Sequence, residues 1–305
     1  MNASHANDPR REALDRFTRT AEKASNDVIR AYSTSFGLAT RLLGSRHRQH
    51  VRNIYAMVRI ADEIVDGVAA EAGLDGDAQA AALSAYERET HAAMRSGYSS
   101  DMVLHAFGRT ALATGIDESL TAPFFASMRA DIAEPESAEP LVTYDAAEHE
   151  RYVYGSAQVV GLMCLRVFLS QERRTEEERA LLERGARQLG AAFQNVNFLR
   201  DIADDTTRLH RGYLGSTSTL TDEDRDGWVD TVRGQLDDAS RAIPLLPRDC
   251  RAAVRTAHGL FLELTERVSR TPAALLYRTR VRVPDTVKLT IAARALARTA
   301  REPRS

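Results

Sequence analysis

The stretch QNVNFLRDIADD, residues 194–205, combines apolar residues with a dense set of amide and acid side chains. On an α-helix each residue turns the side chain by ~100°, so residues three or four positions apart share a face. The polar residues follow this spacing and fall within roughly 80° of one another. They are Gln194, Asn197, Asp201 and Asp205. The stretch therefore predicts a helix with a polar stripe about three turns long.

A second acidic face lies earlier in the chain, in NIYAMVRIADEIVDG, residues 53–67. Its polar residues, at gaps of four, three and four, fall within roughly 60° of one another. They are Tyr55, Arg59, Asp62 and Asp66. On a solvated surface, two aspartates four residues apart repel by only roughly a few tenths of a kcal/mol. Either motif alone is therefore compatible with a plain surface helix.

The two motifs together favour a metal site. The apolar residues around both predict largely buried helices, and four carboxylates facing one cavity would repel strongly unless cations neutralise them. Oxygen ligands without His or Cys favour Mg²⁺, with Mn²⁺ as an alternative, and Mg²⁺ usually shares its ligands with substrate phosphates. Arg59 and Arg200, beside the acids, would supply fixed positive charge to a bound diphosphate. At the mouth of an apolar helical cavity a diphosphate is a leaving group, and its departure makes a carbocation.

The composition is that of an ordinary globular protein and limits the classes of partner. The chain has 305 residues, of which 43% are hydrophobic and 28% charged, with a net charge of −2. This charge argues against nucleic acid as the main partner. Cys164 and Cys250 are too few for a disulfide scaffold or a thiolate metal site, and Cys164 is predicted to be a core residue.

The N-terminus lacks an apolar run of signal-peptide length, and the sequence predicts no membrane-spanning stretch of about 20 apolar residues. A cytoplasmic, non-spanning protein is expected.

Apolar residues recur every three or four positions along nearly the whole chain, which predicts an all-α protein. We expect a partly disordered segment over residues 1–20 and one all-α domain over residues 21–305. The predicted helices cover residues 10–42, 46–68, 77–96, 100–114, 119–132, 144–170, 175–207, 222–243, 248–270 and 285–301.

At this point the residues resemble a known family, the squalene/phytoene synthases, over roughly residues 25–300. The matching blocks are YSTSFGLATRLL at 32–43, IYAMVRIADEIVDG at 54–67, YVYGSAQVVGLM at 152–163, LGAAFQNVNFLRDIADD at 189–205, RGYLG at 211–215 and RVRVP at 280–284. The resemblance implies the isoprenoid synthase fold, with both aspartate helices lining a central apolar cavity. It also implies prenyl diphosphates as substrates.

The resemblance implies roles for individual residues. Mg²⁺ would be bound by Asp62, Asp66, Asp201 and Asp205. Glu63 and Asn197 are secondary candidates, and Glu63 is rotated off the aspartate face. Three tyrosines would lie near the reacting carbons, where an aromatic face stabilises a cation; the alternative is a core residue with a satisfied hydroxyl. These tyrosines are Tyr55, Tyr152 and Tyr213. The substrate-binding residues would be Ser33, Ser35, Tyr55, Arg59, Tyr152, Gln194, Asn197, Arg200, Arg211 and Tyr213.

One position departs from the family pattern. Thr34 stands between Ser33 and Ser35 where relatives often have Lys. The chain thereby loses one potential phosphate contact.

The implied reaction is the head-to-head condensation of two prenyl diphosphates through a cyclopropyl diphosphate. The sequences YSTSFGLATRLL and VRIADEIVDG look most like those of bacterial phytoene synthases. This resemblance implies two geranylgeranyl diphosphates as substrates and phytoene as product. One alternative is a squalene or dehydrosqualene synthase using two farnesyl diphosphates, with NADPH needed only for squalene. Others are a terpene cyclase acting on one prenyl diphosphate, and a non-catalytic assembly protein, which should have lost aspartates that are present here.

The C-terminal segment from Leu275 is rich in arginine. A last helix with a solvated basic face is one interpretation. Peripheral contact with the anionic inner face of a membrane is the other.

Overall fold

The computed structural model describes residues 9–132, 142–143, 145–207, 211–212 and 219–302, and nearly all of them are helical. The helices and strands are α1 (Pro9–Tyr32), α2 (Thr34–Arg41), α3 (Ser45–Asp66), α4 (Val68–Glu71), α5 (Gly76–Ser96), α6 (Met102–Thr114), α7 (Glu118–Ala130), β1 (Val142–Thr143), α8 (Ala146–Val153), η1 (Tyr154–Gln158), α9 (Val159–Leu169), α10 (Glu176–Thr207), β2 (Arg211–Gly212), α11 (Asp222–Ala242), η2 (Ile243–Leu245), α12 (Arg248–Ser269), α13 (Ala273–Leu276) and α14 (Asp285–Arg301).

Capping residues set where several of these helices begin and end. Asp75, Asp101 and Asp117 each accept a hydrogen bond from a backbone N–H in the first turn of α5, α6 and α7. Gly97 and Gly115 close α5 and α6 at a φ of 71°, a left-handed conformation that favours glycine. Short loops can therefore reverse the chain between these helices.

The predicted helices agree with the observed ones to within a few residues, with one clear correction. The helix predicted over residues 10–42 is two helices, because Ser33 leaves the helical conformation and caps α2. The sequence also missed the short α13 and the pair of two-residue strands, β1 and β2, which run parallel. Of the N-terminal segment 1–20, residues 9–20 belong to α1, and residues 1–8 lie outside the described part of the chain.

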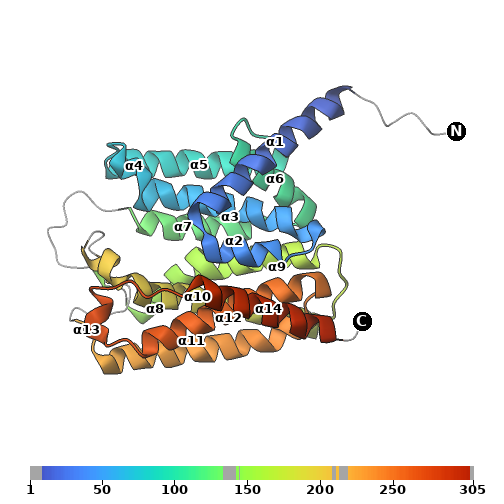
Figure 1. Cartoon of the computed structure of the whole chain (residues 1–305). Helices are drawn as coiled ribbons and strands as arrows, with labels where there is room; N and C mark the ends of the chain where they lie inside the picture. Colours follow the sequence, from blue (N-terminus) through green and yellow to red (C-terminus); the bar gives the residue numbers. More distant parts are fainter. Residues whose placement is uncertain (1–8, 133–141, 144, 208–210, 213–218, 303–305) are drawn as a thin grey trace.

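The helices pack in two layers (Figure 1). One layer holds α1, α3, α5, α6 and α7, and its core contains Met57, Phe107, Phe124 and Phe125. The other holds α10, α11 and α12, and its core contains Val196, Leu199, Val232, Leu236 and Leu264. Helices α2 and α9 lie where the layers meet, so α9 contacts both α3 and α10.

One helical stretch, Ala146–Leu169, is long and apolar enough to cross a membrane by length and composition. The sequence analysis predicted no such stretch, because polar residues such as Ser156 and Gln158 interrupt it. Half of its most apolar window is buried inside the protein. This is weak evidence for a membrane span, because the core helix of a globular protein passes the same test.

Candidate functional site: an apolar cavity between two acidic helices

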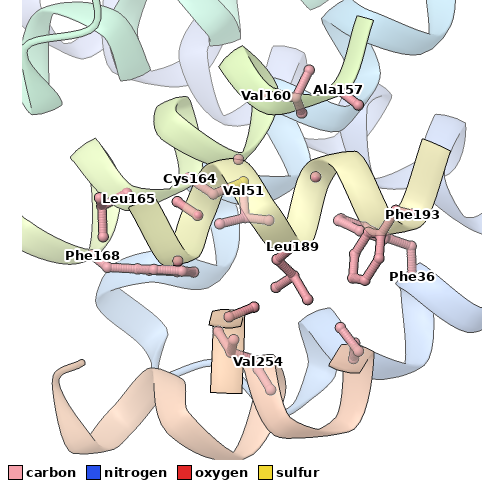
Figure 2. Close-up of a pocket in the computed structure, with 18 of the residues that line it drawn as sticks. Phe36, Val51, Ala157, Val160, Cys164, Leu165, Phe168, Leu189, Phe193 and Val254 are labelled. Carbon is pink, nitrogen blue, oxygen red and sulfur yellow. The ribbon is translucent and has the colours of Figure 1, made fainter. Parts of the chain in front are cut away.

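An apolar cavity of about 340 Å³ lies between the two layers of helices. Figure 2 shows Phe36 and Phe193 at one end of it and Leu165 and Phe168 at the other. Cys164 also lines it, and burial raises the pKa of this thiol to about 12, so the thiol stays protonated. The interior therefore offers hydrocarbon contacts and little that could react.

Helix α10 forms one long wall of this cavity. It contributes lining residues from Leu182 to Asn197, and these fifteen steps correspond to a rise of about 22 Å. Leu182 and Leu189 face the apolar interior, whereas Gln194 and Asn197 lie beyond Phe193 at the opposite end. The cavity is thus elongated, with its polar residues at the Phe36–Phe193 end, which we call the mouth.

Tyr55 of α3 lies at the mouth, where its ring stacks on Phe36 with a centroid distance of 5.7 Å. Burial raises the pKa of the Tyr55 phenol, and Arg59 and a hydrogen bond with Ser33 partly offset the rise. The phenol is therefore protonated near neutral pH. Ser33 itself accepts a hydrogen bond from the backbone N–H of Phe36, at 3.0 Å, as the cap of α2. These contacts bring together three of the predicted site elements, Tyr55, Ser33 and Arg59.

In the first acidic motif, Asp62 forms an ion pair with an arginine of its own helix. One guanidinium nitrogen of Arg59 lies 2.6 Å from Asp62, and the other pairs with Glu63. Burial by itself lowers the pKa of Arg59, but the two carboxylates outweigh it, and the pKa is raised. The guanidinium also lies over the ring of Tyr32, 4.5 Å from its centroid. A fixed positive charge thus lies beside Asp62.

Glu63 shares the Arg59 guanidinium with Asp62. It is buried, and besides Arg59 it accepts a hydrogen bond from the backbone N–H of Val68 at 3.3 Å, in the first turn of α4. This arrangement favours a positioning role over metal ligation. Asp66 is the last residue of α3, one turn beyond Asp62.

In the second acidic motif, Asp201 forms ion pairs with arginines from two parts of the chain. Arg200, its neighbour on α10, donates to Asp201 at 2.9 Å. Arg280, in the segment before α14, places its Nε 2.8 Å from the same carboxylate. Asp201 therefore has one guanidinium partner from its own helix and one from the segment before α14.

The oxygen atoms at the mouth fit a hard divalent cation. The amide oxygen of Asn197 is buried and has no hydrogen-bond partner among the described residues, and Asn197 lies one helical turn before Asp201. An unpaired buried carbonyl oxygen beside carboxylates calls for a cation or a donor. Within the described residues no three His, Cys, Asp or Glu side chains converge, and the side chain of Asp205 lies outside them. The assignment of Mg²⁺ to Asp62, Asp66, Asp201, Asp205 and Asn197 therefore stays a prediction.

Lys288 of α14 lies beside Thr34, the residue that stands where the resembled family often has a lysine. Its ammonium donates to the Thr34 hydroxyl at 3.2 Å and to Asp285 at 3.0 Å, and only 14% of the side chain is exposed. Lys23 is the only other lysine in a chain with 41 basic residues. A positive charge from another helix thus lies next to the cap of α2.

Tyr152 does not line the cavity. Its hydroxyl donates to Asp131 at 2.6 Å, and its ring centroid lies 6.0 Å from that of Phe198, which is not among the residues that line the cavity. The π-helical turn η1 follows directly, and its extra residue rotates α8 relative to α9. In a continuous α-helix Tyr152 would share a face with Ser156 and Val160, which do line the cavity.

Some of the predicted site residues, or their side chains, lie outside the part of the chain that the structure describes. Tyr213 lies outside the described residues, and so do the side chains of Ser35, Asp205 and Arg211. The backbone of Arg211 pairs with Val142 in the short β1–β2 ladder. The roles predicted for these residues stay predictions.

Sequence reasoning assigned no role to Arg280, Lys288 or Tyr32. The motif RVRVP marks the position of Arg280, but nothing in it indicates a contact with Asp201, 79 positions earlier. The rarity of lysine was a usable signal for Lys288. Tyr32 is the first residue of the block YSTSFGLATRLL. Its contact with Arg59 was missed because the break in the helix at Ser33 was not predicted.

Comparison with known proteins places these features in context. A family model described as "Squalene/phytoene synthase" matches residues 29–223, more than half of the chain. The chain is 28% identical over 253 residues to a phytoene synthase of Pseudescherichia vulneris, covering 76% of this chain and 77% of that one. It is 29% identical over 233 residues to the chloroplastic phytoene synthase 3 of Zea mays, of which it spans about half, 51%, with 73% of this chain covered.

Among solved structures, a dehydrosqualene synthase in complex with a ligand superposes with a TM-score of 0.71 at 22% identity. The superposition covers 97% of this chain and 100% of the other. At this identity the likeness shows a shared fold.

Proposed function

The chain belongs to the squalene/phytoene synthase family and has the all-α isoprenoid synthase fold, and from this premise we propose that it condenses two geranylgeranyl diphosphates head to head to give phytoene. The family match and the structural likeness confirm the predicted family and fold class, and they make the chain a prenyltransferase of isoprenoid biosynthesis. The observation that carries the proposal is the cavity, whose α3 wall leads to Asp62 and whose α10 wall leads to Asp201.

The mouth would bind the diphosphates through its charged side chains. Mg²⁺, when bound by the aspartates, would neutralise the leaving diphosphate. Arg59, Arg200 and Arg280 already lie beside Asp62 and Asp201, so their guanidinium groups are positioned to bind phosphate oxygens when the aspartates bind metal. Lys288 would supply the phosphate contact that Thr34 cannot make.

The rest of the cavity would protect the reacting carbons. The Tyr55 ring and its protonated phenol lie where the diphosphate meets the hydrocarbon, so the ring face can stabilise positive charge and the hydroxyl can donate to a phosphate oxygen. Below it the lining is almost wholly apolar, which excludes water from a carbocation. This arrangement would stabilise charge where the leaving group departs and surround the prenyl chains mainly with hydrocarbon.

The apolar part of the cavity is long enough for a prenyl chain. An extended chain advances roughly 1.2 Å per covalent bond, so a geranylgeranyl chain spans roughly 19 Å and a farnesyl chain roughly 14 Å. The apolar lining along α10 spans about 16 Å from Leu182 to Phe193, which takes an extended farnesyl chain or a slightly bent geranylgeranyl chain. The choice of the C20 substrate is supported by the names of the phytoene synthases above.

Product analysis tests the proposal. The protein is incubated with Mg²⁺ and either the C15 or the C20 prenyl diphosphate, with and without NADPH. Phytoene from the C20 substrate, with no need for NADPH, is expected. Squalene, dehydrosqualene or a cyclised terpene would replace this product assignment, and no diphosphate release from either substrate would contradict the enzyme assignment.

A further inference from the structure

Phe168, near the C-terminal end of α9, closes the end of the cavity that lies opposite the mouth. It lines the cavity together with Leu165 of the same helix, and Figure 2 shows both at the end opposite Phe36 and Phe193. The end wall of an apolar cavity limits the length of any hydrocarbon chain that enters from the mouth. The side chain that forms this wall is therefore a candidate determinant of substrate length.

The packing of α9 on α10 gives the level of Phe168 along the cavity. A Cβ added to Gly190 would lie 2.5 Å from the carbonyl oxygen of Ala157. One added to Gly161 would lie 2.5 Å from the carbonyl oxygen of Ala186. The two helices therefore run antiparallel, and the Cα of Phe168 lies about 10 Å beyond the level at which Gly161 meets Ala186.

The direction of the side chain places the ring in the cavity. Leu182, the lining residue of α10 farthest from the mouth, lies about 6 Å beyond the level of Ala186, so the Cα of Phe168 is about 4.5 Å deeper still. Cα–Cβ bonds tilt toward the N-terminus of a helix, and the N-terminal end of α9 is the end nearer the mouth. The Phe168 side chain therefore leans back toward the mouth and forms the end wall at about the level of Leu182.

A cluster of polar side chains beyond the ring prevents the cavity from extending further. The rings of Phe168 and His47 meet edge to face, with their centroids 5.5 Å apart, and His47 is not among the residues that line the cavity. The Nε2 of His47 lies 3.2 Å from Asp249. Arg46 donates to Asp249 at 2.8 Å and to Glu172 at 2.8 Å. A hydrocarbon chain could advance past Phe168 only by displacing these paired groups, which is unfavourable.

The depth of the apolar lining matches the length of a C20 chain. Each isoprene unit adds roughly 5 Å to an extended chain, so C15, C20 and C25 chains span roughly 14, 19 and 24 Å. The lining of α10 from Phe193 to Leu182 spans about 16 Å. A C15 chain would therefore end short of the Phe168 ring, a slightly bent C20 chain would reach it, and a C25 chain would be too long.

We propose that Phe168 sets the upper limit of the prenyl chain at C20, an inference that rests on the proposed function and adds the residue that selects the substrate. The phenyl ring contacts the last isoprene unit of a C20 substrate and excludes a longer chain. Phe168 lies at the opposite end of the cavity from the diphosphate, so it takes no part in the departure of the leaving group. Its replacement changes which chain is used and leaves the mouth unchanged.

Two substitutions at this position should shift the substrate preference in opposite directions. Phe168→Ala frees roughly the space of one isoprene unit, so kcat/KM for the C25 diphosphate relative to the C20 one should rise about tenfold or more. Phe168→Trp enlarges the wall, so kcat/KM for the C20 diphosphate relative to the C15 one should fall about tenfold. Each value is measured with Mg²⁺ and one prenyl diphosphate at a time, by the release of inorganic diphosphate.

Met163→Ala is the matched control for the loss of a large buried side chain. Met163 belongs to the same helix, is fully buried and is not among the residues that line the cavity. Met163→Ala and Phe168→Ala should both lower the melting temperature by roughly 5–10 °C, but only the Phe168 variant should change the ratios between chain lengths. If Phe168→Ala does not fold, Phe168→Leu, which removes less volume, should show the same shift toward C25 with a smaller amplitude.

A binding measurement tests the inference without turnover. The probes are unreactive C15, C20 and C25 thiolodiphosphates, and inorganic diphosphate with Mg²⁺ reports on the mouth alone. Phe168→Ala should raise the affinity for the C25 analogue relative to the C20 analogue about tenfold and leave the affinity for inorganic diphosphate unchanged.

The outcomes distinguish this inference from the proposed function. Unchanged ratios between chain lengths in both Phe168 variants, with an active wild type, would overturn the Phe168 inference alone. A loss of affinity for inorganic diphosphate would also overturn it, because the residue would then act at the mouth. A wild type that binds the analogues but condenses none of the substrates would contradict the proposed function, and the binding ratios would still decide the role of Phe168. A wild type that binds none of the analogues would overturn both.

Discussion

The two acidic motifs hold the same kind of carboxylate in different ways. On α3, Asp62 pairs with Arg59 of its own helix, and Glu63 of the same helix fixes that arginine. On α10, Asp201 pairs with Arg200 next to it and also with Arg280 from the C-terminal segment. The Arg59–Asp62 pair lies within one helix, whereas the Arg280–Asp201 pair joins distant parts of the chain.

This difference bears on how the site is assembled. The Arg59–Asp62 pair can form as helix α3 folds, because both residues belong to that helix. Asp201 acquires its second counter-charge only when the segment before α14 packs against α10. Changes at Arg280 should therefore affect the Asp201 carboxylate more than the Arg59–Asp62 pair.

The largest effect is expected from removing an aspartate of either motif. Asp62→Ala and Asp201→Ala should each lower turnover by about a thousandfold or more, because each removes a charge on which metal-assisted departure of the diphosphate depends. Circular dichroism should show that both variants keep their helices. Near wild-type turnover in either variant would show that its motif lies outside the reaction.

A smaller effect that separates the motifs is expected at Arg280. Arg280→Gln should raise KM for the prenyl diphosphate by about 10- to 100-fold, since a charge-assisted contact at the α10 side is lost. Arg282→Gln is the matched control, because this exposed arginine has the same charge two residues away. Equal KM values for the two variants would refute a role for Arg280 at the mouth.

On α3, the residue Glu63 should affect stability more than turnover. Glu63→Gln removes the charge that holds Arg59 and weakens the acceptor for the Val68 N–H, so we expect a melting temperature lower by about 2–4 °C and turnover within a few-fold of wild type. Glu71→Gln in α4, an exposed position, should leave the melting temperature unchanged. If Glu63→Gln abolished turnover without a change in melting, Glu63 would be a metal ligand after all.

The smallest effect concerns the C-terminal segment beyond Arg280. Helix α14 exposes Leu289 and Leu296 on one face and Arg294 and Arg298 roughly 140–180° around the helix from them, so contact with an anionic membrane would rest mainly on the positive charge. In a vesicle co-sedimentation assay, Arg294→Glu with Arg298→Glu should weaken binding to anionic vesicles several-fold, and salt should do the same. No binding by the wild type at low salt would leave α14 as an ordinary solvated helix.

The fold could be predicted almost completely because helical periodicity is a local property. Apolar spacing placed α10 and α3 and put their acids on one face each. The break at Ser33 was missed because the apolar pattern continues through it, and only the capping hydrogen bond ends α1 there.

The contacts of the site could be predicted only where both residues belong to the same sequence motif. The pairing of Arg59 with Asp62 is local and follows from helical spacing. The contact of Arg280 with Asp201 depends on how α13 and the segment before α14 pack, which no local pattern specifies. Tyr152 was expected near the reacting carbons, and a one-residue π-helical insertion turns it to Asp131 instead, so its catalytic role stays an untested prediction.

The central claim is that the two acidic faces form one Mg²⁺-diphosphate site, and a double-mutant cycle tests it most directly. Binding of an unreactive geranylgeranyl thiolodiphosphate in the presence of Mg²⁺ is measured for wild type, Asp62→Asn, Asp201→Asn and the double variant. If both motifs hold one cluster, the double variant should lose little more affinity than either single variant, because the residues act as a unit. Losses that simply add would mean that the two motifs bind independently and would contradict this account.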